Sequence, residues 1–317
     1  MSAVRIDSVR RATCAVLVLG WLLAGCGEDK APPVAPPGVL WTRITAAAVV
    51  EPDRPDWRAD SIVFETRVGG VERVAVARED GNGVLIQPEP GLAHARAPRW
   101  VASDLVLYSS DALGNEDLWY RVISTGVTRR LTAFGVNTWT PVPRPGAPGV
   151  VYIEGSNPDS GRLALIPDSS AAPLAPLYLT PLGFAAGEPD WNPAGDQICF
   201  STPGPSGSRQ IWRLSLTDTL PVQLTVPSTS TAAGPVIDRS PRWSPDGTRI
   251  LFASNRGGRW GVWTVSPSGE AQGLDVLVLE PVDAEIRHPA WSPDGTRVIL
   301  SSRRSGDRAL WVLSNLP

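Results

Sequence analysis

The chain has 317 residues, 42% of them hydrophobic, and a formal net charge of −3 at pH 7. This hydrophobic content is typical of a globular protein and excludes disorder along the whole chain, and the acidic balance offers no basic surface for nucleic acid. With 30 glycines, 32 prolines and 13 tryptophans, the composition favours short strands joined by tight turns, so we predict an all-β fold.

Residues 1–25 are predicted to be a lipoprotein signal peptide. Three arginines precede an apolar run over residues 12–23, which is shorter than the roughly 20 residues that a membrane-spanning helix needs. The run is followed by Ala-Gly-Cys, which resembles the bacterial lipoprotein signal, so Cys26 is predicted to be acylated and to become the first mature residue. The alternative is an ordinary signal peptide that happens to contain a cysteine.

Residues 26–38 are predicted to be a tether. After Cys26 the segment has four prolines and no hydrophobic periodicity, which is typical of an extended, semi-rigid spacer between a lipid anchor and a folded domain. Gly27 stands where an aspartate tends to retain Gram-negative lipoproteins at the inner membrane. The predicted location is therefore the outer membrane, facing the periplasm. Cys199 is left as the one cysteine of the folded part, and its strand-like surroundings predict a buried apolar side chain.

A repeated anchor divides residues 39–317 into six units. The heptapeptide Trp-Ser-Pro-Asp-Gly-Thr-Arg occurs twice, at residues 243–249 and 291–297, and Pro-x-Trp recurs upstream. A degenerate Pro-Val-Pro at residues 141–143 fills a gap that would otherwise be twice as long as the others. Self-similarity at such a period indicates a repeat architecture. The five Pro-x-Trp anchors end at Trp57, Trp100, Trp191, Trp243 and Trp291.

Each unit is predicted to contain four strands. Pro, Asp and Gly in the heptapeptide suit a tight hairpin turn, and apolar runs such as residues 250–254 follow it. A second apolar-Trp signal lies about 20 residues after most anchors. A fourth strand with Leu-Thr closes three of the units, at Leu131-Thr132, Leu179-Thr180 and Leu224-Thr225.

The last unit has no such fourth strand before Pro317, whereas residues 41–45 precede the first anchor at the matching distance. We therefore predict that this N-terminal strand completes the last unit, which would remove open sheet edges and lock a ring. Six units of four strands make a six-bladed β-propeller over residues 39–317.

Residues 241–256 and 289–303 carry a family resemblance. They read Pro-x-Trp-Ser-Pro-Asp-Gly, an apolar strand, then Ser-x-Arg or Ser-Arg, and they resemble the TolB-like β-propeller family almost position by position. The resemblance covers essentially the whole domain and implies the fold. The same propeller serves binding proteins, peptidase accessory domains and some lyases, so it does not imply one function.

Charged residues just before the anchors are the candidate binding site. They should lie where each inner strand enters the ring, near one mouth of the central channel, where convergent polar groups form a default ligand site. The alternative is that these charges solvate a rim and pair with one another. The candidates are Arg54, Asp56, Arg96, Arg99, Glu188, Asp190, Arg239, Arg242, Arg287 and His288.

The chain has two histidines, His94 and His288. The resemblance includes propeller lyases that hold a metal with several histidines, and two histidines cannot form such a cluster. No metal, cofactor or catalytic residue is therefore predicted. The predicted function is that of a lipid-anchored, monomeric cell-envelope scaffold that binds a protein or peptide without catalysis. The alternatives are an envelope enzyme, a glycan lyase or hydrolase using the charged mouth, and a small-ligand sensor.

Overall fold

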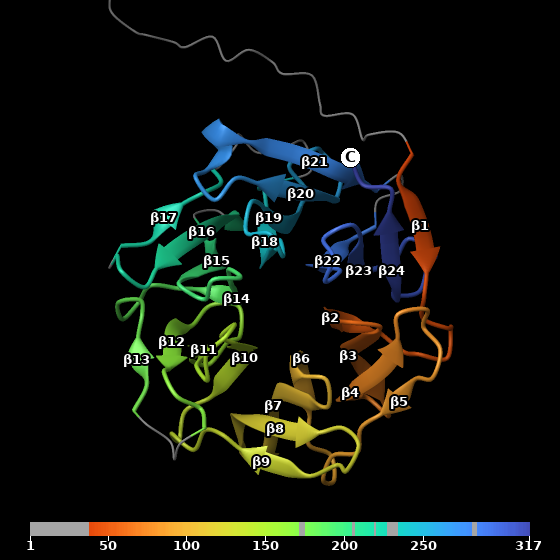
Figure 1. Cartoon of the computed structure of the whole chain (residues 1–317), viewed down its shortest axis with the longest axis vertical. Coiled ribbons are helices and arrows are strands. Elements are labelled where there is room, and N and C mark those ends of the chain that lie inside the picture. The colour runs from red at the N-terminus through yellow and green to blue at the C-terminus, as the bar shows by residue number, and fades with distance from the viewer. Residues whose placement is uncertain (1–37, 171–174, 205–206, 219, 227–233, 281–283) are drawn as a thin grey trace, which may run out of the picture. The chain divides into compact units, whose positions relative to one another are not determined.

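A computed structural model describes residues 38–170, 175–204, 207–218, 220–226, 234–280 and 284–317. Six antiparallel sheets of four strands each follow one another around a ring (Figure 1). The predicted all-β, six-bladed propeller is confirmed. The signal peptide of residues 1–25, the acylated Cys26 and nearly all of the tether of residues 26–38 lie outside the described residues. Within the described part, no helix has the length and apolar character needed to cross a membrane.

Each blade is numbered by the order of its inner strand in the sequence. Blades 1 to 3 contain β2 (Asp53–Arg58), β3 (Ser61–Val68), β4 (Val71–Arg78) and β5 (Leu85–Ile86); β6 (Ala95–Ala102), β7 (Leu105–Leu113), β8 (Asn115–Val122) and β9 (Thr128–Arg130); and β10 (Thr138–Pro143), β11 (Val150–Glu154), β12 (Arg162–Ile166) and β13 (Leu177–Tyr178). The degenerate anchor at residues 141–143 therefore lies at the end of a true inner strand.

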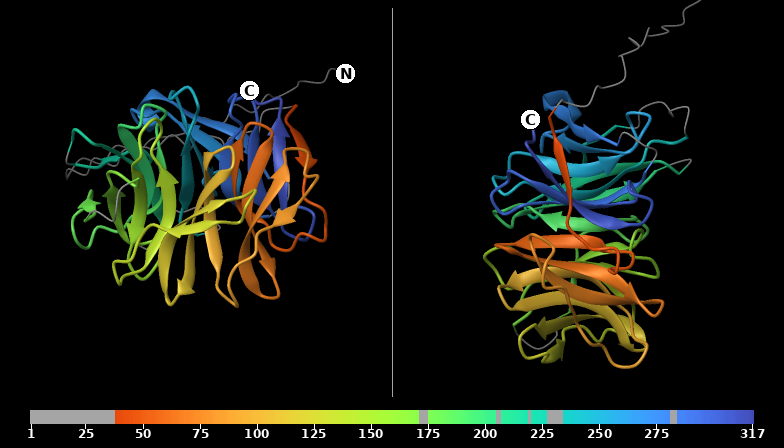
Figure 2. Two further views of the ribbon diagram at one scale, coloured as in Figure 1. Left: turned by 60° about the horizontal axis from the view of Figure 1, so that its bottom comes forward. Right: turned by 90° about the vertical axis from the view of Figure 1, so that its right-hand side faces the viewer.

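Blades 4 to 6 repeat the same order from the centre of the ring outward, and one 3-10 turn, η2 (Glu270–Gln272), interrupts blade 5. They contain β14 (Gly187–Trp191), β15 (Gln197–Pro203), β16 (Arg209–Ser215) and β17 (Val222–Gln223); β18 (Asp238–Trp243), β19 (Ile250–Ser254), β20 (Gly261–Val265) and β21 (Leu274–Leu279); and β22 (Ile286–Trp291), β23 (Val298–Ser302), β24 (Ala309–Ser314) and β1 (Leu40–Arg43). In Figure 2 the strands of each sheet run between the two faces of the ring.

The N-terminal strand closes the ring, as predicted. β1 pairs antiparallel with β24, from Leu40 opposite Ser314 to Arg43 opposite Trp311, and Figure 1 shows the two strands side by side. Just beyond β1, the Thr45 hydroxyl accepts a hydrogen bond of 2.9 Å from the backbone N–H of Leu310. Segments from the two ends of the chain thus share one sheet.

The Leu-Thr pairs lie directly after the short outer strands rather than within them. In each, the threonine hydroxyl accepts a hydrogen bond from a backbone N–H of the third strand, at 2.8 to 3.0 Å, the same contact that Thr45 makes in blade 6. This hydroxyl satisfies a buried donor where the outer strand ends, which explains why the pair recurs. In the three Leu-Thr pairs, the backbone N–H of Leu118 donates to Thr132, that of Leu163 to Thr180 and that of Ile211 to Thr225.

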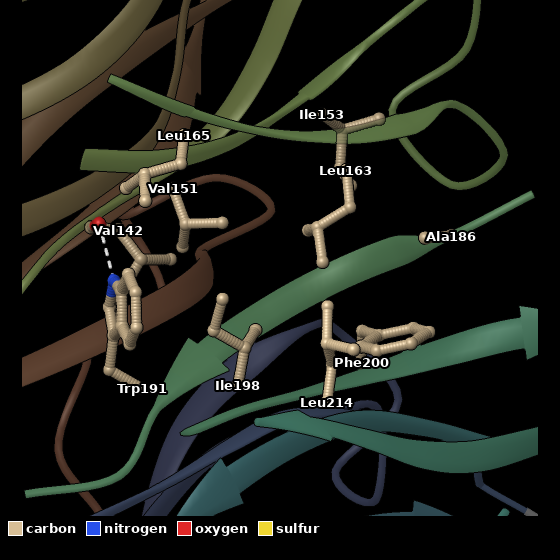
Figure 3. Close-up of a cluster of buried hydrophobic side chains, with 10 residues drawn as sticks. All are labelled: Val142, Val151, Ile153, Leu163, Leu165, Ala186, Trp191, Ile198, Phe200 and Leu214. Carbon is tan, nitrogen blue, oxygen red and sulfur yellow. Dashed lines mark hydrogen bonds between the residues drawn. The ribbon is translucent and has the colours of Figure 1, made fainter. Parts of the chain in front are cut away.

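Anchor tryptophans fill the seams between blades. Trp191 of blade 4 packs on Val142, Val151 and Leu165 of blade 3, and its indole N–H donates to the Val142 carbonyl at 3.3 Å (Figure 3). The five anchor tryptophans are at most 7% exposed. Five large indoles buried between sheets are a major source of apolar contact, because each aromatic side chain buries a large area. Cys199 is fully buried in the neighbouring cluster, as predicted.

Candidate functional site

The inner strands share a local irregularity three residues before the anchor position. Every inner strand carries a register shift in its pairing with the second strand, and the third residue before the anchor has a left-handed φ between 44° and 54°. A proline follows this residue in all six blades. Non-glycine residues rarely adopt this conformation, so its sixfold repetition marks a structural rule of the ring. The six residues are Arg54, Ala97, Thr140, Glu188, Ser240 and His288.

Four residues directly before the anchors close the channel with alternating charges. We call Asp56, Arg99, Asp190 and Arg242 the Asp–Arg layer. The nitrogens of Arg99 lie 3.3 Å from Asp56 and 3.4 Å from Asp190, and those of Arg242 lie 3.8 and 3.5 Å from the same two carboxylates. The four side chains are at most 20% exposed. Residues of blades 1, 2, 4 and 5 are thus joined across the axis of the ring.

Backbone groups complete this layer. The Asp56 carboxylate accepts a hydrogen bond of 2.8 Å from the Trp100 N–H, and Asp190 accepts one of 2.9 Å from the Trp243 N–H. Each aspartate therefore binds the backbone of the following blade. Burial nevertheless outweighs the favourable charges, raising the pKa of Asp56 and raising the pKa of Asp190 to about 7.

A second layer is formed by residues two or three positions earlier on the inner strands, and it centres on His288 of blade 6. Its Nδ1 is 2.7 Å from the Asp53 carboxylate of blade 1, and its Nε2 is 3.4 Å from the Glu188 carboxylate of blade 4. Glu188 also accepts hydrogen bonds from the Ser240 N–H at 2.9 Å and from the Ser240 hydroxyl at 2.6 Å. The imidazole therefore bridges three blades.

The charges of this layer support one another. Burial by itself lowers the pKa of His288, but the Asp53 and Glu188 carboxylates raise it above its ordinary value. Burial likewise opposes ionisation of Glu188, yet the contact with His288 holds its pKa well below the usual range. Arg54, the remaining candidate at this level, lies 3.8 Å from Glu65 and 3.9 Å from Asp159.

The last three candidates, Arg96, Arg239 and Arg287, lie one residue further from the anchors and are more exposed. Arg96 pairs with Glu116 at 2.8 Å, and both Arg239 and Arg287 pair with Glu285, at 2.6 and 2.7 Å. Burial by itself raises the pKa of Glu285, but its contacts with Arg239 and Arg287 lower it to about 2. At Glu116 burial outweighs the contact with Arg96 and raises the pKa above its usual value.

The structure brings seven of the ten predicted residues together at the central cavity, whereas Arg96, Arg239 and Arg287 pair with Glu116 and Glu285 further from the anchors. Each of the ten has a partner of opposite charge within the chain. The central cavity, lined by residues of all six blades, measures about 20 Å³. About 10–15 Å³ of such volume holds a single water molecule, so the cavity has no space for a sugar or a peptide. The predicted charged mouth is, in this structure, a set of ion pairs, of which those of the Asp–Arg layer and of His288 with Glu188 cross the ring.

Sequence reasoning missed several members of this network. Asp53 occupies the position four residues before Trp57 that Arg96, Arg239 and Arg287 occupy in other blades, so alignment of all anchors could have found it. Glu285 lies outside the inner strands, and only the fold brings it to the two arginines.

The two histidines are both engaged with carboxylates. The Nδ1 of His94 contacts Glu72, and His288 lies between Asp53 and Glu188. Across the described ranges, no group of three or more His, Cys, Asp or Glu residues could hold a metal ion. Burial raises the pKa of the Cys199 thiol well above its usual value, which disfavours the reactive thiolate.

Comparisons with known proteins place the fold. No protein-family model and no curated protein sequence matches the chain. A crystal structure of TolB from Acinetobacter baumannii superposes with a TM-score of 0.61 at 18% identity, over 82% of this chain and 66% of that one. The chain folds as a TolB-like six-bladed propeller. It thus spans just under two thirds of that TolB chain.

Enzymes share the same architecture. A gluconolactonase from Xanthomonas campestris has a TM-score of 0.61 at 14% identity, over 91% of this chain and 96% of its own. An oligogalacturonate lyase in complex with manganese has a TM-score of 0.55 at 13% identity, over 87% and 93%. At such low identity these likenesses establish the fold of this chain and leave its activity to the site itself.

Proposed function

We propose that the protein is a lipid-anchored scaffold of the bacterial cell envelope that binds a protein or peptide partner and catalyses no reaction. The observation that carries this proposal is the closed channel. A catalytic centre in the channel would need room for substrate and free polar groups to act on it. Instead the members of the Asp–Arg layer pair with one another, His288 pairs with Asp53 and Glu188, and the cavity has about the volume of a water molecule.

The proposed anchor is Cys26, with residues 1–25 removed as a signal peptide and residues 26–38 as the tether of a propeller over residues 39–317. The proposed location is the periplasmic side of the outer membrane. The anchor can be tested by Cys26→Ser, which should abolish incorporation of labelled fatty acid and move the protein from the membrane to the soluble fraction. Cys14→Ser, within the signal peptide, is the matched control and should leave both unchanged.

The scaffold role can be tested by crosslinking and mass spectrometry in the native envelope. Recovery of a specific protein partner with the wild type would support the proposal. Sedimentation of the purified protein as a monomer would support it further. The enzyme alternative makes the opposite prediction: no specific partner, and turnover of a glycan by the purified protein that is lost in Arg242→Ala and His288→Gln. That second pattern would replace the scaffold with a lyase or hydrolase. Stabilisation by a small molecule in a thermal-shift screen, without a protein partner, would favour a sensor.

A further inference from the structure

One blade lacks the tryptophan that fills the seam in front of every other blade. The anchor position of blade 3 is Pro143. At the other five seams the anchor indole lies in a cluster with apolar residues of the preceding blade, and three of the five are also covered by an arginine of that blade. These arginines are Arg144 over Trp191, Arg249 over Trp291 and Arg297 over Trp57, at 4.6 to 5.4 Å from the ring centroids.

Strand register shows which residues would surround an indole at position 143. In the next seam, Trp191 contacts Arg144 and Leu165 of blade 3. Arg144 is the first residue after its anchor, so its counterpart in blade 2 is Val101. Leu165 is reached through the pairs Val142–Val151 and Val151–Leu165. The same path in blade 2, Arg99–Leu107 and Leu107–Tyr120, ends at Tyr120.

Val101 and Tyr120 line two adjoining hollows at this seam. The hollows measure about 340 and about 500 Å³ and share Val101, Tyr120, Pro148 and Ser169. Pro143 lines the larger one. These volumes lie within the roughly 300–1,000 Å³ that is typical of small-ligand sites. The interior of this seam is packed by an apolar cluster that includes Leu118, Tyr152 and Ile166, and Arg129 lies over the Tyr120 ring at 4.8 Å. The two hollows therefore lie on the outer side of the seam, beside Pro143 and the counterparts of the residues that contact an anchor indole elsewhere.

The charged side chains that line the two hollows are all arginines. Arg58, Arg129 and Arg144 line the two hollows, whose lining contains no acidic residue. Within the described part of the chain, none of the three forms a salt bridge: Arg129 donates to the Ser169 carbonyl at 3.0 Å, and Arg144 donates to the Gly195 carbonyl at 2.7 Å. Two hollows of similar volume, about 320 and 460 Å³, lie at the seams of Trp191 and Trp291, and they differ in charge because Asp218 lines one and Asp275 the other. Near the arginine-lined hollows, the Asp168 carboxylate accepts hydrogen bonds from Ser170.

We propose that the seam between blades 2 and 3 is a binding site for an aromatic side chain of a partner protein, carried on a segment with flanking carboxylates. The seam site consists of Val101, Leu105, Tyr120, Pro143 and Pro148. The aromatic ring lies in the hollows beside the position of the missing anchor indole, packing on Tyr120 and Val101. The carboxylates pair with Arg58, Arg129 and Arg144. This inference rests on the proposed scaffold function, since it names the chemistry of the partner segment that the scaffold would bind.

Binding can be measured with the peptide acetyl-Glu-Trp-Glu-amide in which the tryptophan carries a 5-fluoro group. Fluorine NMR observes the peptide alone, so the 13 tryptophans of the protein do not interfere. We expect line broadening that saturates with wild-type protein. The peptides acetyl-Glu-Ala-Glu-amide and acetyl-Lys-Trp-Lys-amide should compete at least tenfold more weakly, because each lacks one of the two features that the site recognises.

The decisive variant is Pro143→Trp, which supplies the seam with an indole from the chain itself. It should weaken peptide binding at least tenfold while its melting temperature stays at or above that of the wild type. Val68→Trp adds an indole at an exposed site in blade 1 and should bind as the wild type does. If Pro143→Trp does not fold, Val127→Glu gives the test, since this exposed side chain lines the smaller hollow and a carboxylate there should repel the peptide.

Equal binding by the wild type and by both seam variants would overturn the seam site, as would equal competition by the alanine peptide. Sedimentation that reveals dimers abolished by Pro143→Trp would also overturn it, because the occupant would then be a second copy of the chain. The scaffold proposal fails separately, when crosslinking in the envelope recovers no partner. A partner that is still captured by Pro143→Trp would leave the scaffold in place and reject the seam as its docking site.

Discussion

The seams between blades and the central channel are built from the same six inner strands but differ in chemistry. The anchor tryptophans of five strands enter apolar seams, whereas the charged residues one and three positions before the anchors lie at the channel and form ion pairs. Burial of apolar area stabilises with little opposing cost. Buried charges lose hydration that their pairing only partly restores. The stability of the ring therefore resides in the seams, and the channel contributes alignment of the blades and sensitivity to pH.

The largest expected effect comes from removing the strand that closes blade 6. Deleting residues 39–46 removes the pairing of β1 with β24, the contact of Trp41 with Trp311 at 6.3 Å between ring centroids, and the Thr45 hydroxyl bond. We expect a loss of about 5 kcal/mol, because the partly buried Trp41, a whole strand pairing and a buried hydrogen bond are lost together, and truncation of a fully buried tryptophan alone costs about 3–5 kcal/mol. Denaturant titration followed by circular dichroism measures it. A midpoint close to that of the full chain would mean that the ring is closed in another way.

Next in size is a direct comparison of two seams. Trp191→Ala should cost about 4 kcal/mol, because it empties the seam between blades 3 and 4. Pro143→Ala, at the equivalent position of the open seam, should cost about 1 kcal/mol or less, since no packed indole is lost. Equal losses of unfolding free energy in urea denaturation would show that both seams contribute similarly to stability. The argument for an open site would then fail.

Removing one arginine of the Asp–Arg layer should lower the free energy of unfolding by a somewhat smaller amount. Arg242→Ala leaves the Asp190 and Asp56 carboxylates with one arginine between them, and we expect a loss of about 3 kcal/mol. The double variant Arg242→Met with Asp190→Leu removes one charge of each sign and should lose less than Arg242→Ala alone. A double variant that is clearly less stable than the single one would give the channel charges a net stabilising role and reverse the comparison.

Much of the fold was readable from the repeat. Turn residues, anchors and the Leu-Thr pairs gave six blades, and the distance from Trp41 to Trp57 gave the closing strand. Local patterns suffice there because a propeller repeats one unit whose contacts are with its neighbours in sequence. The degenerate anchor at Pro143 was recognised as a repeat, but its consequence, an open seam, depends on the packing of blade 2 against blade 3.

The site was only half predictable. Seven of the ten residues meet at the central cavity, since their spacing from the anchors fixes their position on each inner strand. Their mutual pairing could not be read from the sequence, because Arg99 and Asp190 belong to blades 2 and 4 and meet only across the axis. The residues predicted to form a mouth therefore close the channel, because the ring brings side chains of opposite blades into contact.

The last prediction concerns the pH dependence of stability, which should change with a substitution in the channel but not with one in a seam. Asp190→Asn removes a carboxyl whose pKa burial raises to about 7 in the folded chain, well above the value near 3.8 of an exposed aspartate. Because the folded state holds the proton more tightly, this group contributes stability below pH 4 that is lost as pH rises to 7. The wild type should therefore lose about 2 kcal/mol relative to Asp190→Asn between pH 5 and pH 7 and then remain level. Trp191→Ala, which changes no charge, should show the pH profile of the wild type at lower stability. If Asp190→Asn also keeps the wild-type profile in urea titrations at each pH, the Asp–Arg layer is fully ionised throughout, and its pairing is stronger than the cost of burying it.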